Sequence, residues 1–272
     1  NNTQLQQQQA QHDAVTPTPP DLLAVAVKTA NTNMVDAVLE KHPDAINGAD
    51  QSDGATPVHW AALMGNMHIL DHLLEKGGKP DAVVESTGMQ PIHWAATRGH
   101  VEIVKRLIAA GVPIDVVDVK QTTPLAIAAQ YDHTVLVYYL VKQRADIALT
   151  DVCDDSALHW AAYKGNLSSA ALLHFLGLPA DAADSYGSTP LYLAAAQGGA
   201  NVVEYLLEST DAQALMALKD KKGRTAHAVA QERGQAHVLR AMAPMVPTLA
   251  QRLLACCIGQ GGDAIMFTFF WV

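Results

Sequence analysis

Apolar residues recur along the chain at helical spacing, in short stretches separated by turns rich in Asp and Gly. In the copy that begins at Pro57, the side chains predicted to share one helix face are Val58, Ala61, Ala62 and Gly65. A second apolar stretch follows and ends at a pair of glycines; its predicted core residues are Ile69, Leu73 and Leu74. Small residues on the first face allow a close neighbour, so the pattern predicts a pair of short, packed helices.

The same unit returns at near-constant spacing. The position of Pro57 is taken in later copies by residues 91, 124, 157, 190 and 226, so the steps are 34, 33, 33, 33 and 36 residues. A degenerate copy, from Leu22 to Leu39, precedes them. A period near 33 with a Thr-Pro-Leu-His-x-Ala motif resembles the ankyrin repeat. Because one unit has too small a core to fold alone, we expect an all-α solenoid of six helix-pair repeats plus the degenerate first copy.

Composition divides the chain into three parts. Residues 1–20 are rich in Gln and Pro, and we expect a disordered lead-in there. The repeats predict a domain over 21–243. The segment 244–272 follows a basic stretch and ends in an apolar run of nine residues from Ala264, which predicts the possible start of a transmembrane helix.

The net charge is −9, from 18 basic and 27 acidic side chains, and it argues against a nucleic-acid partner. Three cysteines without a Cys-x-x-Cys pair exclude a disulfide scaffold and give no zinc ligand set. Cys153 lies in an acidic turn, which disfavours a thiolate nucleophile. The repeated histidines are predicted to bond to backbone groups at helix starts rather than to hold a metal; they are His59, His93 and His159. No catalytic residue is predicted in this chain.

A narrower resemblance rests on the order of the repeat variants, at residues 59–62, 93–100, 128–133 and 160–163. This order is similar to the N-terminal ankyrin region of DHHC-type protein S-acyltransferases, which are palmitoyltransferases. The resemblance implies repeats that recruit client proteins on the cytosolic face of an internal, Golgi-type membrane. The chain has no Asp-His-His-Cys sequence. Zinc and acyl-CoA are therefore expected only for a catalytic half outside it, and no cofactor is expected within it.

Three tryptophans lie three residues after the repeated proline position, off the predicted core face: Trp60, Trp94 and Trp160. The residues four positions further on share their helical face, and in four copies these are Met64, Arg98, Tyr131 and Lys164. Stacked repeats would align both sets along the concave groove, where they could contact an extended client segment. Each Trp could instead fill a gap between neighbouring helices.

The resemblance favours a partner contact for Trp94. In the related enzymes a matching Trp and an Asn one repeat earlier grip a substrate peptide, and Met64 stands at that Asn position here. Two functions follow from these observations. The first is the client-recruiting domain of a membrane-bound palmitoyltransferase. The second is a soluble, cytoplasmic ankyrin adaptor with no associated enzyme.

Overall fold

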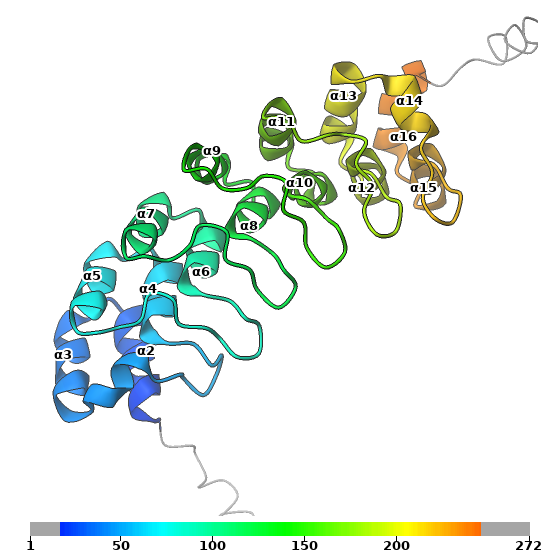
Figure 1. Cartoon of the computed structure of the whole chain (residues 1–272). Helices are drawn as coiled ribbons and strands as arrows, with labels where there is room; N and C mark the ends of the chain where they lie inside the picture. The colour runs from blue at the N-terminus through cyan, green and yellow to red at the C-terminus, as the bar shows by residue number, and fades with distance from the viewer. Residues whose placement is uncertain (1–16, 246–272) are drawn as a thin grey trace, which may run out of the picture.

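The computed structural model describes residues 17–245, which form seven stacked pairs of helices (Figure 1). The first helices of the pairs are α2 (Pro19–Lys28), α4 (Pro57–Met64), α6 (Pro91–Arg98), α8 (Pro124–Gln130), α10 (Ala157–Lys164), α12 (Pro190–Gln197) and α15 (Ala226–Glu232). The second helices are α3 (Thr32–Lys41), α5 (Met67–Glu75), α7 (Val101–Ala109), α9 (Thr134–Lys142), α11 (Leu167–Phe175), α13 (Ala200–Ser209) and α16 (Ala236–Met242). The predicted all-α solenoid is confirmed.

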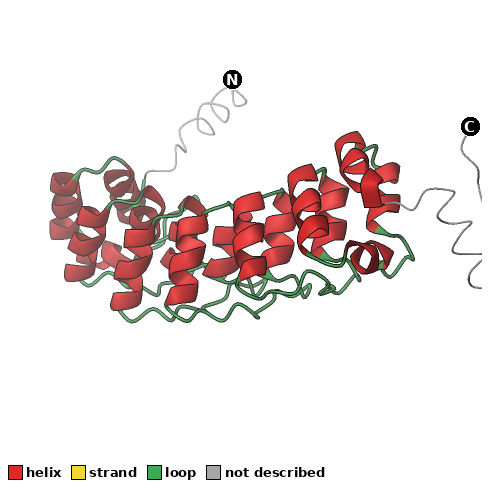
Figure 2. Ribbon diagram, turned by 90° about the horizontal axis from the view of Figure 1, so that it is seen from above, coloured by secondary structure: helices red, strands yellow, loops and turns green. Residues whose placement is uncertain are grey.

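The pairs form an arc, with the first helices on its concave side and the second helices on its convex side (Figure 1). The loops that join one pair to the next run along one edge of the array (Figure 2). We call the tips of six of these loops the fingers; they are residues 50–55, 84–89, 118–122, 151–155, 184–188 and 220–224. Backbone bonds join successive fingers, as in the bond from the Val152 N–H to the Lys120 carbonyl, 3.0 Å.

Each first helix begins as the sequence predicts. Thr123 and Thr189 precede prolines, and their side chains accept hydrogen bonds from backbone N–H groups of the first turn, both at 3.2 Å. Several first helices end at a glycine with positive φ, such as Gly65 at 70°. The repeated motif therefore sets both ends of the helix that lines the groove.

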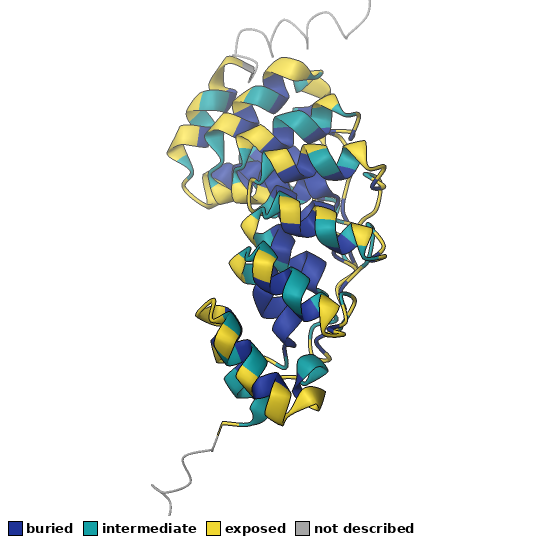
Figure 3. Ribbon diagram, turned by 90° about the vertical axis from the view of Figure 1, so that its left-hand side faces the viewer, coloured by how far each residue is buried: buried dark blue, intermediate teal, exposed yellow. Residues whose placement is uncertain are grey.

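Buried residues are concentrated in the interior of the array, and exposed residues lie on its outer helices (Figure 3). The predicted face of α4 is fully buried, with Val58, Ala61 and Ala62 all at 0% exposure. In α5 the buried residues are Ile69, Leu70 and Leu73, and the predicted core residue Leu74 is partly buried and packs against the same core. The pattern therefore missed one core residue, Leu70.

An additional helix, α14 (Ala212–Ala217), lies between α13 and α15. The Asp211 side chain caps it, accepting from the N–H groups of Gln213 and Ala214 at 3.2 Å each. The sequence did not predict this helix. It lies in the longest step of the repeat, the 36 residues between positions 190 and 226. Two short 3₁₀ helices, η1 (Pro43–Asn47) and η2 (Ala243–Met245), complete the described elements.

A second set of bonds joins the repeats behind the groove. Before four of the second helices, the preceding residue sends its side chain to a carbonyl near the end of the first helix of the preceding repeat: His100 to Leu63 (3.1 Å), His133 to Thr97 (3.0 Å), Asn166 to Gln130 (2.9 Å) and Gln235 to Ala196 (3.4 Å). At Gly199 no side chain exists. A Cβ built there would lie only 3.2 Å from the Cα of Gly165, so two backbones meet instead.

Most of the predicted lead-in and nearly all of the segment 244–272, with its apolar run from Ala264, lie outside the described residues. Within 17–245, none of the helices combines the length and the hydropathy that a membrane crossing requires.

Candidate functional site

Five of the six fingers begin with a buried aspartate that organises its own loop. In each case Oδ1 accepts hydrogen bonds from two backbone N–H groups further along the finger; the residues are Asp50, Asp118, Asp151, Asp184 and Asp220. Burial opposes ionisation, but for Asp50 the hydrogen bonds outweigh it and hold the pKa of the carboxyl below its usual range. The same balance lowers the pKa of Asp220 to about 2.

The second oxygen of these aspartates distinguishes one repeat from another. Trp60 Nε1 donates to Asp50 Oδ2 at 2.8 Å, and Trp160 Nε1 donates to Asp151 Oδ2 at 3.1 Å. Where the sequence replaces the Trp with Ile127 or Leu193, the second oxygen of the finger aspartate has no hydrogen-bond partner among the described residues. Each Trp is therefore tied to its finger only where a carboxylate is available.

Trp94 does not form this hydrogen bond to its finger. Val84 stands where the other fingers carry aspartate, and no described residue accepts a hydrogen bond from the Trp94 indole nitrogen. The ring is nevertheless fixed, because it packs edge-on against Trp60, with centroids 5.1 Å apart, and against His59 at 5.3 Å. Trp94 thus combines a rigid, partly exposed aromatic ring with a donor that is free in this part of the chain.

Trp60 has a different environment. It is 9% exposed, and the Lys28 ammonium lies 3.4 Å from the centroid of its ring. With Trp94 against it and Asp50 bonded to its nitrogen, Trp60 supports Trp94 and has little surface left for a partner. A direct partner contact by Trp60 stays a prediction.

The predicted polar and aliphatic column lies at the ends of the first helices. Met64 is 45% exposed and Tyr131 is 52% exposed, and Arg98 and Lys164 are also exposed. Trp160 is partly buried and packs edge-on against Tyr163, with centroids 6.0 Å apart. The structure brings Trp60 and Trp94 into contact, while the repeat that contains Ile127 separates both from Trp160. The peptide-binding role of the column stays a prediction.

The three histidines bond to the backbone as predicted. Each Nδ1 accepts from the N–H group of the residue before the helix, Thr56, Gln90 or Ser156. Each Nε2 donates 3.1 Å to a carbonyl of the loop that follows, at Met89, Val116 or Ala182. Burial lowers the pKa of all three rings, that of His59 to about 4. With both nitrogens bonded, these rings are neutral structural groups.

One group in the described part of the chain has metal-ligand spacing: ligand atoms of Asp151, Cys153 and Asp155 lie within 4.8 Å of one another. Both oxygens of Asp151 already accept hydrogen bonds, from the finger backbone and from Trp160. A metal would have to break these bonds, so the donor set fits an ordered finger better than a metal site.

Asp155 differs from the finger aspartates because nothing satisfies it. Its Oδ1 is buried without a hydrogen-bond partner. Burial, followed by the nearby carboxylates of Asp151, Asp184 and Asp154, raises the pKa of Asp155 to about 7. The folded protein therefore holds a proton on Asp155 that the unfolded chain releases near pH 4, and the stability contributed by that proton falls as pH rises from 4 to 7.

We expect Asp155→Asn to stabilise the protein at pH 8 by on the order of 2 kcal/mol, allowing for the partial exposure of the site. Near pH 4 the variant and the parent should differ little, because Asp155 is then protonated in the folded state. Urea unfolding of both proteins at pH 4 and pH 8 measures this difference. A gap of equal size at both pH values would contradict the assignment.

Comparison with known proteins gives a consistent result. A family model described as ankyrin repeats in three copies matches residues 68–151, 136–216 and 158–247, and a single-repeat model matches 53–82. The chain is 34% identical to the palmitoyltransferase AKR1 of Saccharomyces cerevisiae over 199 residues, 71% of this chain and 26% of that protein.

Of two further relatives, one is named as a palmitoyltransferase and the other is not. The putative palmitoyltransferase ZDHHC13 of Danio rerio is 27% identical over 142 residues, 52% of this chain and 22% of that protein. Human inversin is 33% identical over 194 residues, 68% of this chain and 18% of that protein. The chain thus spans about a quarter or less of each of these relatives. The three-copy family model covers more than half of the chain, and the helix pairs of the structure repeat with the period of the ankyrin motif. The chain therefore belongs to the ankyrin-repeat family.

Proposed function

We propose that this chain is the client-recruiting domain of a membrane-bound protein S-palmitoyltransferase, and that Trp94 holds an extended client segment in the concave groove. The observation that carries the proposal is the Trp94 indole, which is rigid and partly exposed, and which has no acceptor among the described residues. Solenoids use their concave surfaces to bind extended partners. The similarity to AKR1 supplies the enzyme class.

The contact has a simple chemistry. A proline ring or an aliphatic side chain of the client can lie against the indole face, and a backbone carbonyl of the client can accept from the free N–H. Arg98, exposed on the same helix, can bond a second carbonyl or a carboxylate. Met64, exposed one repeat earlier, adds apolar contact where the related enzymes carry Asn.

Zinc and acyl-CoA belong in this proposal to a catalytic half outside the chain. Cys153 is the one cysteine in 17–245, and the carboxylates around it do not form a zinc site of the family's Cys-rich type. The repeats would then lie on the cytosolic side of an internal membrane, with segment 244–272 leading toward it. Sequencing the gene beyond codon 272 tests this arrangement. We expect apolar spans and a segment with Asp-His-His-Cys, and a stop codon directly after Val272 would contradict the enzyme assignment.

A soluble adaptor is the second candidate, because human inversin, whose name carries no acyltransferase activity, is about as similar in identity as the yeast enzyme. Both candidates use the same groove. The gene sequence therefore separates them, whereas peptide binding tests what they share.

The groove is tested with peptides selected against the protein from a random phage-displayed library. Hydrogen–deuterium exchange of the protein with one such peptide should show protection in α6 and in the finger 84–89. Protection confined to the convex helices, such as α7 and α9, would contradict a groove contact.

A further inference from the structure

A pocket lies on the concave side of the array, toward its C-terminal end. Its volume is about 400 Å³, and it extends across α10, α12 and the fingers of the fourth to sixth repeats. We call it the C-terminal pocket. Its aromatic lining consists of Trp160, Tyr163, Tyr186 and Tyr192. This pocket is separate from the pair formed by Trp60 and Trp94, neither of which lines it.

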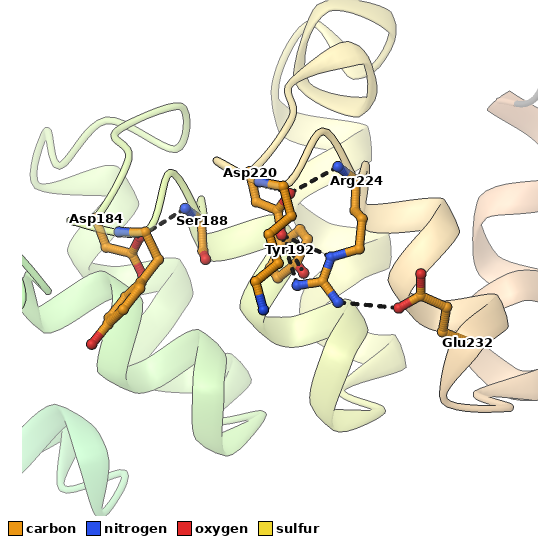
Figure 4. A network of polar contacts seen from close by, with 8 residues as sticks. Asp184, Ser188, Tyr192, Asp220, Arg224 and Glu232 are labelled. Atoms are coloured by element: carbon orange, nitrogen blue, oxygen red, sulfur yellow. Dashed lines mark hydrogen bonds and ion pairs between the residues drawn. The ribbon is translucent and has the colours of Figure 1, made fainter.

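The two arginines that line the pocket are already bonded to other groups. Arg224 donates to Asp220 Oδ2 through Nε at 2.9 Å and through Nη2 at 2.7 Å, and its Nη1 donates to Glu232 at 3.1 Å (Figure 4). Arg233 donates to the Ala196 carbonyl at 3.1 Å. Two carboxylates neutralise Arg224, which therefore offers little attraction to an anion. Lys221 and Lys222 also line the pocket, but both are exposed to solvent, which screens their charge.

The acidic wall is not paired. Asp184 is 7% exposed and lines the pocket; its Oδ1 accepts from the N–H groups of Tyr186 and Ser188, and its Oδ2 has no partner among the described residues. Figure 4 shows Asp184 bonded to Ser188, across from the Arg224 network. Asp155 also lines the pocket, and its pKa is raised to about 7 by burial and by the carboxylates around it. A cation placed here would gain two partners and relieve that repulsion.

We propose that the C-terminal pocket receives an arginine side chain of the bound client, with the guanidinium bonded to Asp184 and Asp155 and stacked on the aromatic lining. Arginine fits better than lysine, because its planar group offers several donors to two carboxylates and stacks on aromatic rings. The proposal rests on the proposed function, since it adds a second contact to the client segment held at Trp94.

The probe is N-acetyl-L-arginine methylamide, with the neutral citrulline analogue as its isosteric control. The sequence contains four tryptophans, so few indole N–H signals appear in a nitrogen–proton spectrum of labelled protein. We expect a saturable shift of the Trp160 indole signal with a dissociation constant near the millimolar range, which is reasonable for one side chain. The citrulline analogue should bind at least tenfold more weakly.

Two variants test the carboxylates. Asp184→Asn keeps an oxygen for the finger N–H groups but removes the charge, and it should weaken arginine binding at least tenfold; Asp155→Asn should act in the same direction. Asp118→Asn is the matched control, because Asp118 has the same finger position and the same unpartnered second oxygen but lies outside the pocket. It should leave arginine binding unchanged.

Equal binding of the arginine and citrulline probes would overturn the proposal, as would full arginine binding by a folded Asp184→Asn protein. The arginine titration and the test of the groove at Trp94 are separate experiments, because the groove is tested by the binding of selected peptides. A saturable arginine response supports the pocket even if no Trp94-dependent peptide is found. Trp94-dependent peptides without an arginine response overturn the pocket alone.

Discussion

Trp94→Ala is expected to weaken the binding of a groove-selected peptide by roughly thirtyfold or more, since removal of a central aromatic contact costs on the order of 2 kcal/mol or more. The variant should remain folded, because Trp94 is partly exposed and no described residue accepts a hydrogen bond from its nitrogen. Calorimetry measures the affinity, and circular dichroism with the melting midpoint monitors the fold. Full affinity in a folded Trp94→Ala protein would refute the groove assignment.

A second variant separates the ring from its donor. Val84→Asp supplies the carboxylate that the other fingers have, in a finger with the same spacing to its helix as the one that begins at Asp50. The new carboxylate should accept a hydrogen bond from the Trp94 N–H, as Asp50 accepts one from that of Trp60. Peptide affinity should then fall although the indole remains. Trp60→Ala is the structural comparison, and it should mainly lower the melting midpoint, because it removes a buried support.

Acidification from pH 7 to pH 4 is expected to destabilise the protein by several kcal/mol through His59, His93 and His159. In the unfolded chain these rings titrate near 6.5, whereas burial lowers the pKa of each in the fold, that of His59 to about 4. Below pH 6.5 the unfolded chain binds protons that the folded chain does not, so stability falls with pH. His59 alone contributes about 3 kcal/mol over this range.

Asp155 acts in the opposite sense, because its raised pKa favours the folded state as pH falls. Three histidines outweigh one carboxyl, and urea unfolding at pH 7, 6 and 5 should show the net loss. His93→Gln removes one ring whose pKa burial lowers and keeps a side-chain donor, so it should reduce the pH slope. An unaltered slope in His93→Gln would show that the ring is not a source of the acid sensitivity.

The repeating elements could be predicted because their signals are local. Four of the seven first helices start with Thr-Pro, and the repeated copies share a small-residue face and a turn within about a dozen residues, so the structure places them as expected. The helix α14 was missed because it occurs in one step only, so no other copy of the repeat indicates it. Leu70 was missed because residues 69, 70 and 73 also share one side of a helix, and the apolar pattern alone does not choose between that side and one centred on Leu74.

Part of the candidate site could be predicted from the sequence in the same way. Aligning the fingers would have shown that Val84 takes the place of an aspartate, and this substitution leaves Trp94 without an acceptor. The C-terminal pocket could not be predicted. It depends on which oxygens of Asp155 and Asp184 remain unpaired after three fingers have packed, and the sequence shows only that acidic residues recur in turns.

The contact at Gly199 has a mechanical consequence. A stack of repeats behaves as springs in series, and under load the most compliant spring takes up most of the strain. At the junction between α10 and α12 the residue before the second helix is Gly199, so this junction lacks the side-chain bond to a first-helix carbonyl that the three junctions just before it and the one after it have. The second helices of the same two repeats are joined by Tyr205, whose hydroxyl lies 3.3 Å from the Ala171 carbonyl oxygen and 3.2 Å from His174 Nδ1. Bending of the array should therefore open this junction at Gly199, with the contact at Tyr205 as the pivot. A client that spanned this junction, from Trp94 to the C-terminal pocket, would stiffen the arc, so the protein's elasticity would report whether the groove is filled.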